Sequence, residues 1–233
     1  MAVAAAAAAV ILFLILANRY RLGRRHILWL TLITITSGFI GALLFSIIES
    51  SIVYRTIVIT VTGLRADGFP IAAIASILIY ARANKLPFWP LLDIGTPCLI
   101  LFMAIYRVGC VLIGCCYGLP CDLPLAVTYN NPGSLAPLGM PVYPTQLYHL
   151  IWNVAVLLII LLLRKSLKPV GSLGLMGWIL YFAGDFVIRF FRGNEPPVIL
   201  LSLSQLTDLA LIAVAIYFLV QRFKKAGLAR VDS

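Results

Sequence analysis

Long runs of apolar residues dominate this sequence, and short segments rich in arginine and lysine separate them. Hydrophobic residues make up 62% of the 233 residues, whereas charged residues make up only 11%. An average soluble domain carries about 25% charged residues. One water-soluble core could not bury this much apolar surface, and most of the runs are long enough to cross a bilayer as helices. We therefore expect an all-α membrane protein in which residues 1–233 form a single polytopic domain.

The apolar runs predict about seven transmembrane helices. The expected spans are residues 2–17, 26–50, 69–80, 90–116, 146–163, 171–191 and 198–220. No basic residue precedes the first run and four arginines follow it, so we expect a retained helix rather than a cleaved signal peptide. Residues 57–61 are expected to form a re-entrant or strand-like piece.

The distribution of basic residues favours one orientation in the membrane. With the N-terminus outside, the segments 18–26, 81–86, 164–169 and 221–233 lie in the cytoplasm and carry 13 of the 18 lysines and arginines. This asymmetry follows the positive-inside rule, so we expect a cytoplasmic C-terminus and an extracytoplasmic loop at residues 117–145. Because the net charge of +10 is concentrated in these short clusters, nucleic acid is not an expected partner.

One arginine, Arg107, lies near the end of the fourth apolar run. A charge at the centre of a bilayer costs about 2.5 to 3.5 kcal/mol even on insertion scales, so an arginine near that depth indicates a bound anion. The abundant anion in a bilayer is lipid phosphate, which matches the planar fork of a guanidinium group. We expect Arg107 to bind a lipid head group, and Gly109 to let that group approach closely.

A second charged group lies near the end of the sixth apolar run. Asp185, Arg189 and Arg192 are spaced by four and three residues, which places them on one helix face. Asp185 can neutralise Arg189, leaving Arg107 or Arg192 to bind an external anion. The alternatives are a structural ion-pair network and, for Arg192, a side chain that snorkels to the membrane interface.

Other polar residues allow two interpretations each. Asp67, just before the third run, could be a general base near the membrane face or the N-cap of a helix. Tyr143, Gln146 and Tyr148, at the start of the fifth run, could bind a lipid head group or cap their helix.

Five cysteines, at positions 98, 110, 115, 116 and 121, fall within 24 residues. Their odd number does not indicate a disulfide framework, and the adjacent Cys115 and Cys116 are poorly placed to pair. The spacing Cys-x4-Cys-Cys-x4-Cys is not usual for zinc. Packing as small apolar residues is the preferred interpretation, with thiol redox chemistry and metal binding as alternatives. We predict no metal site and no cofactor.

From about residue 63 to residue 205 the chain resembles the bacterial prolipoprotein diacylglyceryl transferases. The resemblance includes Asp67-Gly68, Arg107-Val108-Gly109, Tyr143-Pro144-Thr145-Gln146-Leu147-Tyr148 and Phe190-Phe191-Arg192. It implies a multi-pass protein of the bacterial plasma (inner) membrane, with membrane lipids around it. The implied reaction moves diacylglyceryl from phosphatidylglycerol to the cysteine thiol of a lipoprotein precursor, which the enzyme meets at its signal peptide, and glycerol phosphate is released. Arg107 matches the arginine that holds the phosphatidylglycerol head group in this family.

The chain departs from the family pattern at several positions. The family has histidine where this chain has Asp67, asparagine at Cys110 and glutamate at Cys115. On the sixth helix it has arginine and then glutamate, whereas this chain has Asp185 and then Arg189. On this resemblance we expect Asp67, Asp185 and Arg189 to be catalytic. The alternatives are a non-catalytic membrane paralogue that binds or transports lipids or anions, and a thiol-dependent redox membrane protein.

Overall fold

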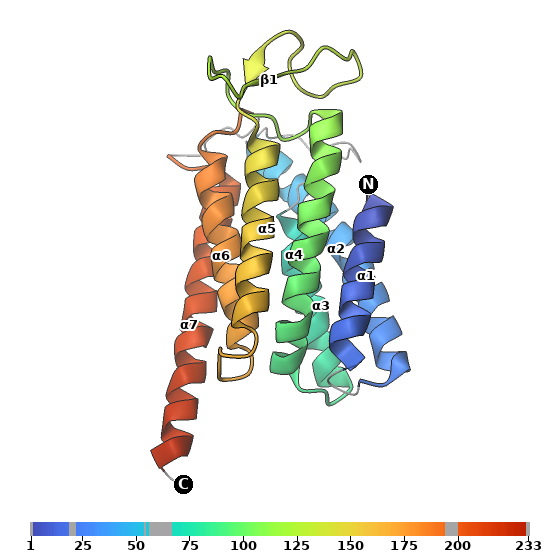
Figure 1. Ribbon diagram of the computed structural model, residues 1–233, viewed down its shortest axis with the longest axis vertical. Coiled ribbons are helices and arrows are strands. Elements are labelled where there is room, and N and C mark those ends of the chain that lie inside the picture. Colours follow the sequence, from blue (N-terminus) through green and yellow to red (C-terminus); the bar gives the residue numbers. More distant parts are fainter. Residues whose placement is uncertain (1, 19–21, 54, 56–66, 194–199, 232–233) are drawn as a thin grey trace. The chain divides into compact units, whose positions relative to one another are not determined.

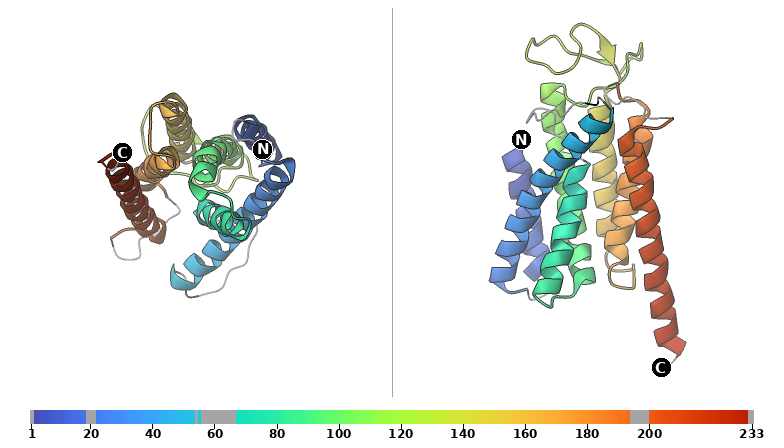
Figure 2. Two further views of the ribbon diagram at one scale, coloured as in Figure 1. Left: turned by 90° about the horizontal axis from the view of Figure 1, so that it is seen from below. Right: turned by 180° about the vertical axis from the view of Figure 1, so that it is seen from behind.

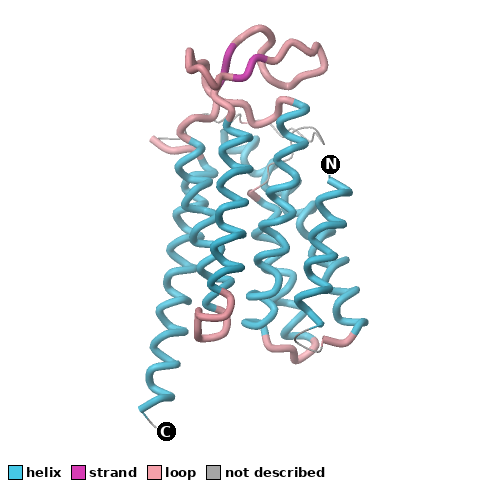
Figure 3. The backbone as a smooth tube through the Cα atoms, viewed as in Figure 1, coloured by secondary structure: helices cyan, strands magenta, loops and turns pink. Residues whose placement is uncertain are grey.

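The described residues of the protein fold into α-helices and one very short pair of strands (Figure 3). The computed structural model describes residues 2–18, 22–53, 55, 67–193 and 200–231. Within these residues the elements are α1 (Ala2–Asn18), α2 (Arg24–Val53), α3 (Gly68–Ala83), α4 (Phe88–Ile113), β1 (Val127–Thr128), β2 (Pro141–Val142), α5 (Thr145–Leu163), α6 (Ser172–Arg189) and α7 (Leu203–Val231) (Figure 1).

This architecture confirms the predicted all-α membrane fold. Helices α2, α4, α5, α6 and α7 are long and apolar enough to cross a bilayer, and α1 and α3 are shorter apolar helices. The orientation of the helices in the membrane stays a prediction. The expected re-entrant piece at residues 57–61 lies outside the described residues.

Several predicted helix boundaries were wrong, among them the end of α7, which continues to Val231 rather than ending at residue 220. Two of the differences have a clear local cause. Helix α4 ends at Ile113 rather than Cys116, because Gly114 has a left-handed φ of +75° and its N–H binds the carbonyl of Cys110. Helix α7 begins at Leu203 rather than residue 198. Its start is a capping box, in which Gln205 N–H donates to Ser202 Oγ and Ser202 N–H donates to Gln205 Oε1.

The chain divides into two compact units, so the expected single domain contains two parts. One unit is Val10–Gly95, and the other combines Met1–Ala9 with Thr96–Ser233. In the first unit, α2 and α3 lie side by side (Figure 2). A Cβ atom on Gly41 of α2 would overlap the Gly68 carbonyl oxygen of α3, so glycine permits this close approach.

The second unit contains the C-terminal part of α4 together with α5, α6 and α7. Helix α6 packs against both α5 and α7 (Figure 1). Gly177 of α6 brings three helices together, because a Cβ atom there would lie 2.7 Å from Thr96 Cγ2 of α4 and 3.4 Å from Ile160 Cγ2 of α5. Gly184 lies against the indole of Trp152, whose Nε1–H donates to the Leu180 carbonyl over 2.8 Å.

The loop between α4 and α5 extends beyond the ends of these helices (Figure 1). Its base is held by backbone hydrogen bonds on both sides. Leu119 N–H donates to Phe191 O just after α6, and Tyr143 N–H, just before α5, donates to Leu119 O. Gly193 N–H also donates to Tyr117 O. These bonds fix the end of α4 against the start of α5 and the end of α6.

The contact between Gly184 and Trp152 predicts a specific packing defect. In Gly184→Val the new side chain would overlap the indole, so we expect a loss of about 1 to 3 kcal/mol in the free energy of unfolding. Unfolding of the purified protein in detergent measures this difference. Gly227→Val is the matched control, because a Cβ at this α7 position meets no described atom within 4 Å. Equal stability of the two variants would contradict the packing described for α5 and α6.

Candidate functional site

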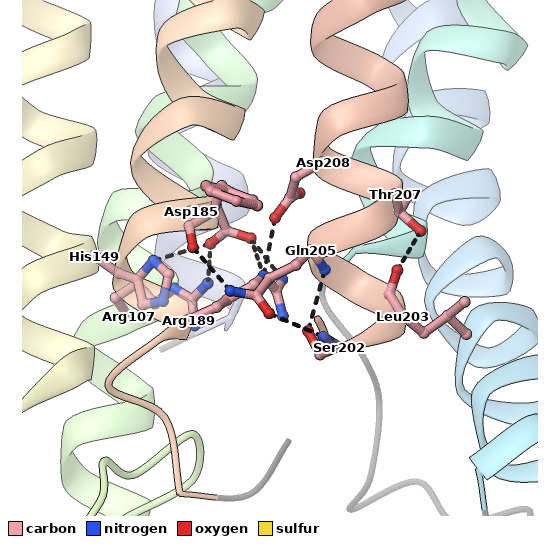
Figure 4. Close-up of polar contacts among 10 residues, drawn as sticks. Arg107, His149, Asp185, Arg189, Ser202, Leu203, Gln205, Thr207 and Asp208 are labelled. Carbon is pink, nitrogen blue, oxygen red and sulfur yellow. Dashed lines mark hydrogen bonds and ion pairs between the residues drawn. The ribbon is translucent and has the colours of Figure 1, made fainter. Parts of the chain in front are cut away.

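A buried cluster of charged residues connects all four helices of the second unit, with Asp185 of α6 at its centre (Figure 4). The Asp185 side chain is only 3% exposed. Its Oδ2 accepts a hydrogen bond of 2.8 Å from Arg189 Nε. Its Oδ1 lies 3.0 Å from Nδ1 of His149 on α5 and 3.7 Å from Nη2 of Arg107 on α4. One carboxylate therefore holds groups from three helices.

Arg189 extends the cluster to α7. Its Nε lies 3.1 Å from Oδ2 of Asp208, and both side chains are buried. The predicted pairing of Asp185 with Arg189 is confirmed, and these residues also form the ion-pair network that the sequence allowed as an alternative. Asp208 was missed by the sequence analysis, although a lone aspartate in an apolar helix is itself a signal for a buried partner or a site.

Two nitrogen atoms in this cluster have unused hydrogen-bonding capacity within the described residues. Nη1 of Arg107 and Nε2 of His149 are buried, and neither has a hydrogen-bond partner among the described residues. Leaving a buried polar atom unsatisfied costs about 1 to 3 kcal/mol, and more for a charged group, so a ligand that fills both positions would be stabilised. Arg107 is only 2% exposed, which makes it a strong electrostatic donor in a low-dielectric site.

The position of His149 indicates its protonation. Because Nδ1 faces the Asp185 carboxylate, the ring proton belongs on Nδ1, and Nε2 then carries a lone pair. A carboxylate that orients a histidine in this way is a common arrangement for a general base. His149 directly follows Tyr148 in the sequence, but its pairing with Asp185 depends on the packing of α5 against α6.

Arg192 lies just past the end of α6, where its backbone bridges that of Gly118. Its side chain is 7% exposed, which does not fit the alternative of snorkelling to the interface. Its role as an anion-binding residue stays a prediction. Gly109 is buried in α4, two residues past Arg107.

The polar residues at the start of α5 hold the turn that follows α4. Thr145 Oγ1 donates to Cys116 O over 2.6 Å, and Gln146 Nε2 donates to Cys115 O over 2.8 Å. Gln146 Nε2 also donates to the hydroxyl of Tyr129, 3.2 Å away. Burial raises the pKa of the Tyr129 hydroxyl, which therefore stays protonated. The bonds from Thr145 and Gln146 to the backbone position the turn that follows α4. None of these contacts is a side-chain cap of α5.

The two tyrosines of the same segment pack on one aromatic ring. The ring centroids of Tyr143 and Tyr148 lie 5.3 Å and 6.3 Å from that of Phe191. Both side chains are partly exposed. Binding of a lipid head group by Tyr143, Gln146 and Tyr148 stays a prediction.

Asp67 belongs to the other unit, where it occupies the N-cap position of α3. The cap position predicted for Asp67 is therefore confirmed, but its side chain makes no capping hydrogen bond. Its role as a catalytic base stays a prediction.

Three of the five cysteines come together beside Arg107. The Sγ atoms of Cys110, Cys115 and Cys116 all lie within 4.8 Å of one another, and all three thiols are free. The buried position of Cys110 agrees with the packing interpretation, but the spacing in sequence did not predict the cluster.

Comparison with known proteins identifies the family. The family model for prolipoprotein diacylglyceryl transferase matches residues 1–221. A relative from Dehalococcoides mccartyi, named phosphatidylglycerol–prolipoprotein diacylglyceryl transferase, is 36% identical over 202 residues, which cover 85% of this chain and 78% of the relative. A relative of the same name from Clostridium tetani is 29% identical, covering 86% of this chain and 82% of the relative. With nearly its whole length matched, this chain belongs to the prolipoprotein diacylglyceryl transferase family, a family of membrane enzymes.

Proposed function

We propose that this protein transfers a diacylglyceryl group from phosphatidylglycerol to the cysteine thiol of a lipoprotein precursor, in the bacterial plasma membrane. The family and the names of the relatives support the reaction. The observation that carries the proposal is the buried guanidinium of Arg107, which lies against Asp185 through Nη2 and whose Nη1 has no hydrogen-bond partner among the described residues.

Arg107 is the group proposed to bind the lipid phosphate. Asp185 lies 3.7 Å from Nη2 and orients the guanidinium, while Nη1 donates to a phosphate oxygen. When the bond between the glyceryl carbon and the phosphate oxygen breaks, the phosphate changes from a singly charged diester to a monoester with more negative charge. A fixed cation in a buried site stabilises that developing charge more than the ground state, which lowers the barrier.

His149 is the group proposed to activate the acceptor. A cysteine thiol has an unperturbed pKa of about 8.5 and is mostly protonated at neutral pH, so a base is needed. Nε2 of His149 takes the thiol proton, the sulfur forms a bond to the glyceryl carbon, and the carbon–oxygen bond breaks. Glycerol phosphate leaves and takes the proton from the imidazolium. Asp185 stabilises that imidazolium through its 3.0 Å contact with Nδ1.

The remaining residues have supporting roles in this proposal. Arg189, held by Asp185 and Asp208, keeps the carboxylate of Asp185 in place. Gly109 leaves room for the head group, and Arg192 supplies a second cation. Tyr143, Gln146 and Tyr148 contact the lipid at the start of α5. Asp67, at the position of the family's histidine, is the alternative base.

The acceptor is proposed to reach the site from the extracytoplasmic side. The loop between α4 and α5 would lie outside in the predicted orientation, and its base adjoins the ends of α4 and α6 that carry Arg107 and Arg189. Signal peptides are apolar segments, and this entry path would let one remain in the lipid while its cysteine reaches His149.

Replacement of Arg107 tests the phosphate site. The assay incubates purified protein, in vesicles that contain phosphatidylglycerol, with a precursor peptide that bears the acceptor cysteine, and detects the mass of the added diacylglyceryl group. We expect the parent to modify the peptide and Arg107→Ala to lose at least about 100-fold in rate, as for loss of one main electrostatic donor. Arg107→Lys should recover only part of the loss, because an ammonium lacks the planar fork.

The control variant is Arg82→Ala, which removes an exposed arginine at the end of α3. It should keep the rate of the parent. A parent protein that never shifts the mass of the peptide would contradict the transferase proposal, and binding of phosphatidylglycerol that depends on Arg107 without turnover would favour a lipid-binding paralogue.

Replacement of His149 tests the base. We expect His149→Gln to lower the maximal rate by about 100- to 10,000-fold, the usual contribution of a general base, while phosphatidylglycerol binding is kept. The pH–rate profile should also lose its acid limb. Asp67→Asn is the parallel variant. If Asp67→Asn lost this rate while His149→Gln kept the rate of the parent, the base would be Asp67 instead.

A further inference from the structure

The three clustered thiols form a feature that the proposed transfer reaction does not use. Cys110 lies in the last turn of α4, and Cys115 and Cys116 follow in the turn after the helix. Their sulfur atoms are mutually within 4.8 Å, whereas Cys98 and Cys121 are not in this cluster. A disulfide needs two sulfur atoms, so a convergence of three points to a ligand that binds all of them.

The separation of the sulfur atoms suits a metal ion. Zn²⁺ binds thiolates at about 2.3 Å in tetrahedral geometry, which places sulfur atoms about 3.8 Å apart. The sulfur atoms here need to approach by about 1 Å at most to reach that spacing. Thiolates select soft or borderline ions such as Cu⁺, Zn²⁺ and Cd²⁺ over Mg²⁺ and Ca²⁺.

The backbone of the turn holds the thiols in this arrangement. Gly114 leaves the helix with φ +75°, and Cys116 has φ +56°, a left-handed conformation that is uncommon for a residue with a side chain. The carbonyls of Cys115 and Cys116 accept hydrogen bonds from Gln146 and Thr145. Strained backbone that the surroundings hold in place is typical of ligand sites.

The charges around the cluster are also suitable. Three thiolates and one divalent ion leave a net charge of −1. The guanidinium of Arg107 interacts electrostatically with Cys110 and Cys116, and that of Arg192 with Cys116, so fixed positive charge is available to balance it. Cys110 is buried, while Cys115 and Cys116 are partly exposed.

We propose that Cys110, Cys115 and Cys116 form a three-thiolate site for one thiophilic metal ion of the Zn²⁺ class. With three protein ligands, the fourth tetrahedral position stays open to water or to an incoming ligand. Binding exchanges three S–H protons for one metal ion, so up to three protons are released for each ion bound.

A titration with Cd²⁺ tests the site without use of the transfer assay. The full-length protein in detergent is fully reduced and treated with a chelator, and then titrated with Cd²⁺ while the ultraviolet sulfur-to-metal charge-transfer band is recorded. We expect saturation at one ion per chain, with proton release, and Cd²⁺ should displace Zn²⁺ that was bound beforehand. Absence of the band in the reduced protein would overturn the proposal, whatever the outcome for transfer.

Cysteine variants assign the ligands. Each of Cys110→Ser, Cys115→Ser and Cys116→Ser should weaken Cd²⁺ binding by more than the roughly 10- to 100-fold that loss of an outer-shell partner costs. The control is Cys121→Ser, because Cys121 lies in the same loop but outside the cluster. This variant should bind Cd²⁺ as the parent does. An unchanged band in the variant that lacks all three thiols would also overturn the proposal.

A measurement on the parent protein avoids any question of folding in the variants. Bound Cd²⁺ should protect Cys115 and Cys116 from alkylation, read by mass spectrometry for each residue, and leave Cys121 reactive. Equal protection of Cys115, Cys116 and Cys121, or protection of none of these thiols, would contradict the proposed site. A disulfide among the three thiols in protein isolated without reductant, together with no metal binding after reduction, would show a redox pair instead.

Discussion

The arrangement of the second unit depends on the Asp185 carboxylate. In an apolar surrounding an isolated charge is strongly destabilised, and a buried ion pair is stable only where its geometry and further contacts are good. Asp185 meets this condition by contacting Arg107, His149 and Arg189 from three helices, and Asp208 adds the fourth helix through Arg189. Nη1 of Arg107 and Nε2 of His149 have no hydrogen-bond partner within the described part of the chain, so the proposed site uses the same side chains that join the helices.

A second constraint acts at the end of α4. The turn at Gly114, Cys115 and Cys116 is held from α5 by Thr145 and Gln146, and the following segment is bonded to the chain just after α6. This framework fixes the depth of Arg107 relative to Asp185 and gathers the three thiols. Gln146, which the sequence suggested as a lipid ligand, therefore holds the backbone around the site.

The fold and part of the site could be predicted because they depend on local patterns. Apolar runs of membrane length specify helices whatever their neighbours, and the spacing of four between Asp185 and Arg189 pairs them on one helix. The contacts of His149 and Asp208 could not be predicted in this way, because helix periodicity does not state which face of α5 or α7 meets α6. The end of α4 was misplaced for a related reason, since the apolar run continues through Gly114 although the backbone turns there.

The sequence by itself determined a multi-pass helical protein, its family and the arginine predicted to bind an anion, because hydropathy and short motifs are properties of the chain. Only the tertiary structure decided that Asp185 is shared among Arg107, His149 and Arg189, and that three cysteines with an unusual spacing converge. Those arrangements follow from close packing at Gly177 and Gly184 and from the backbone at Gly114 and Cys116. They are contacts across helices and turns, and no spacing along the chain specifies them.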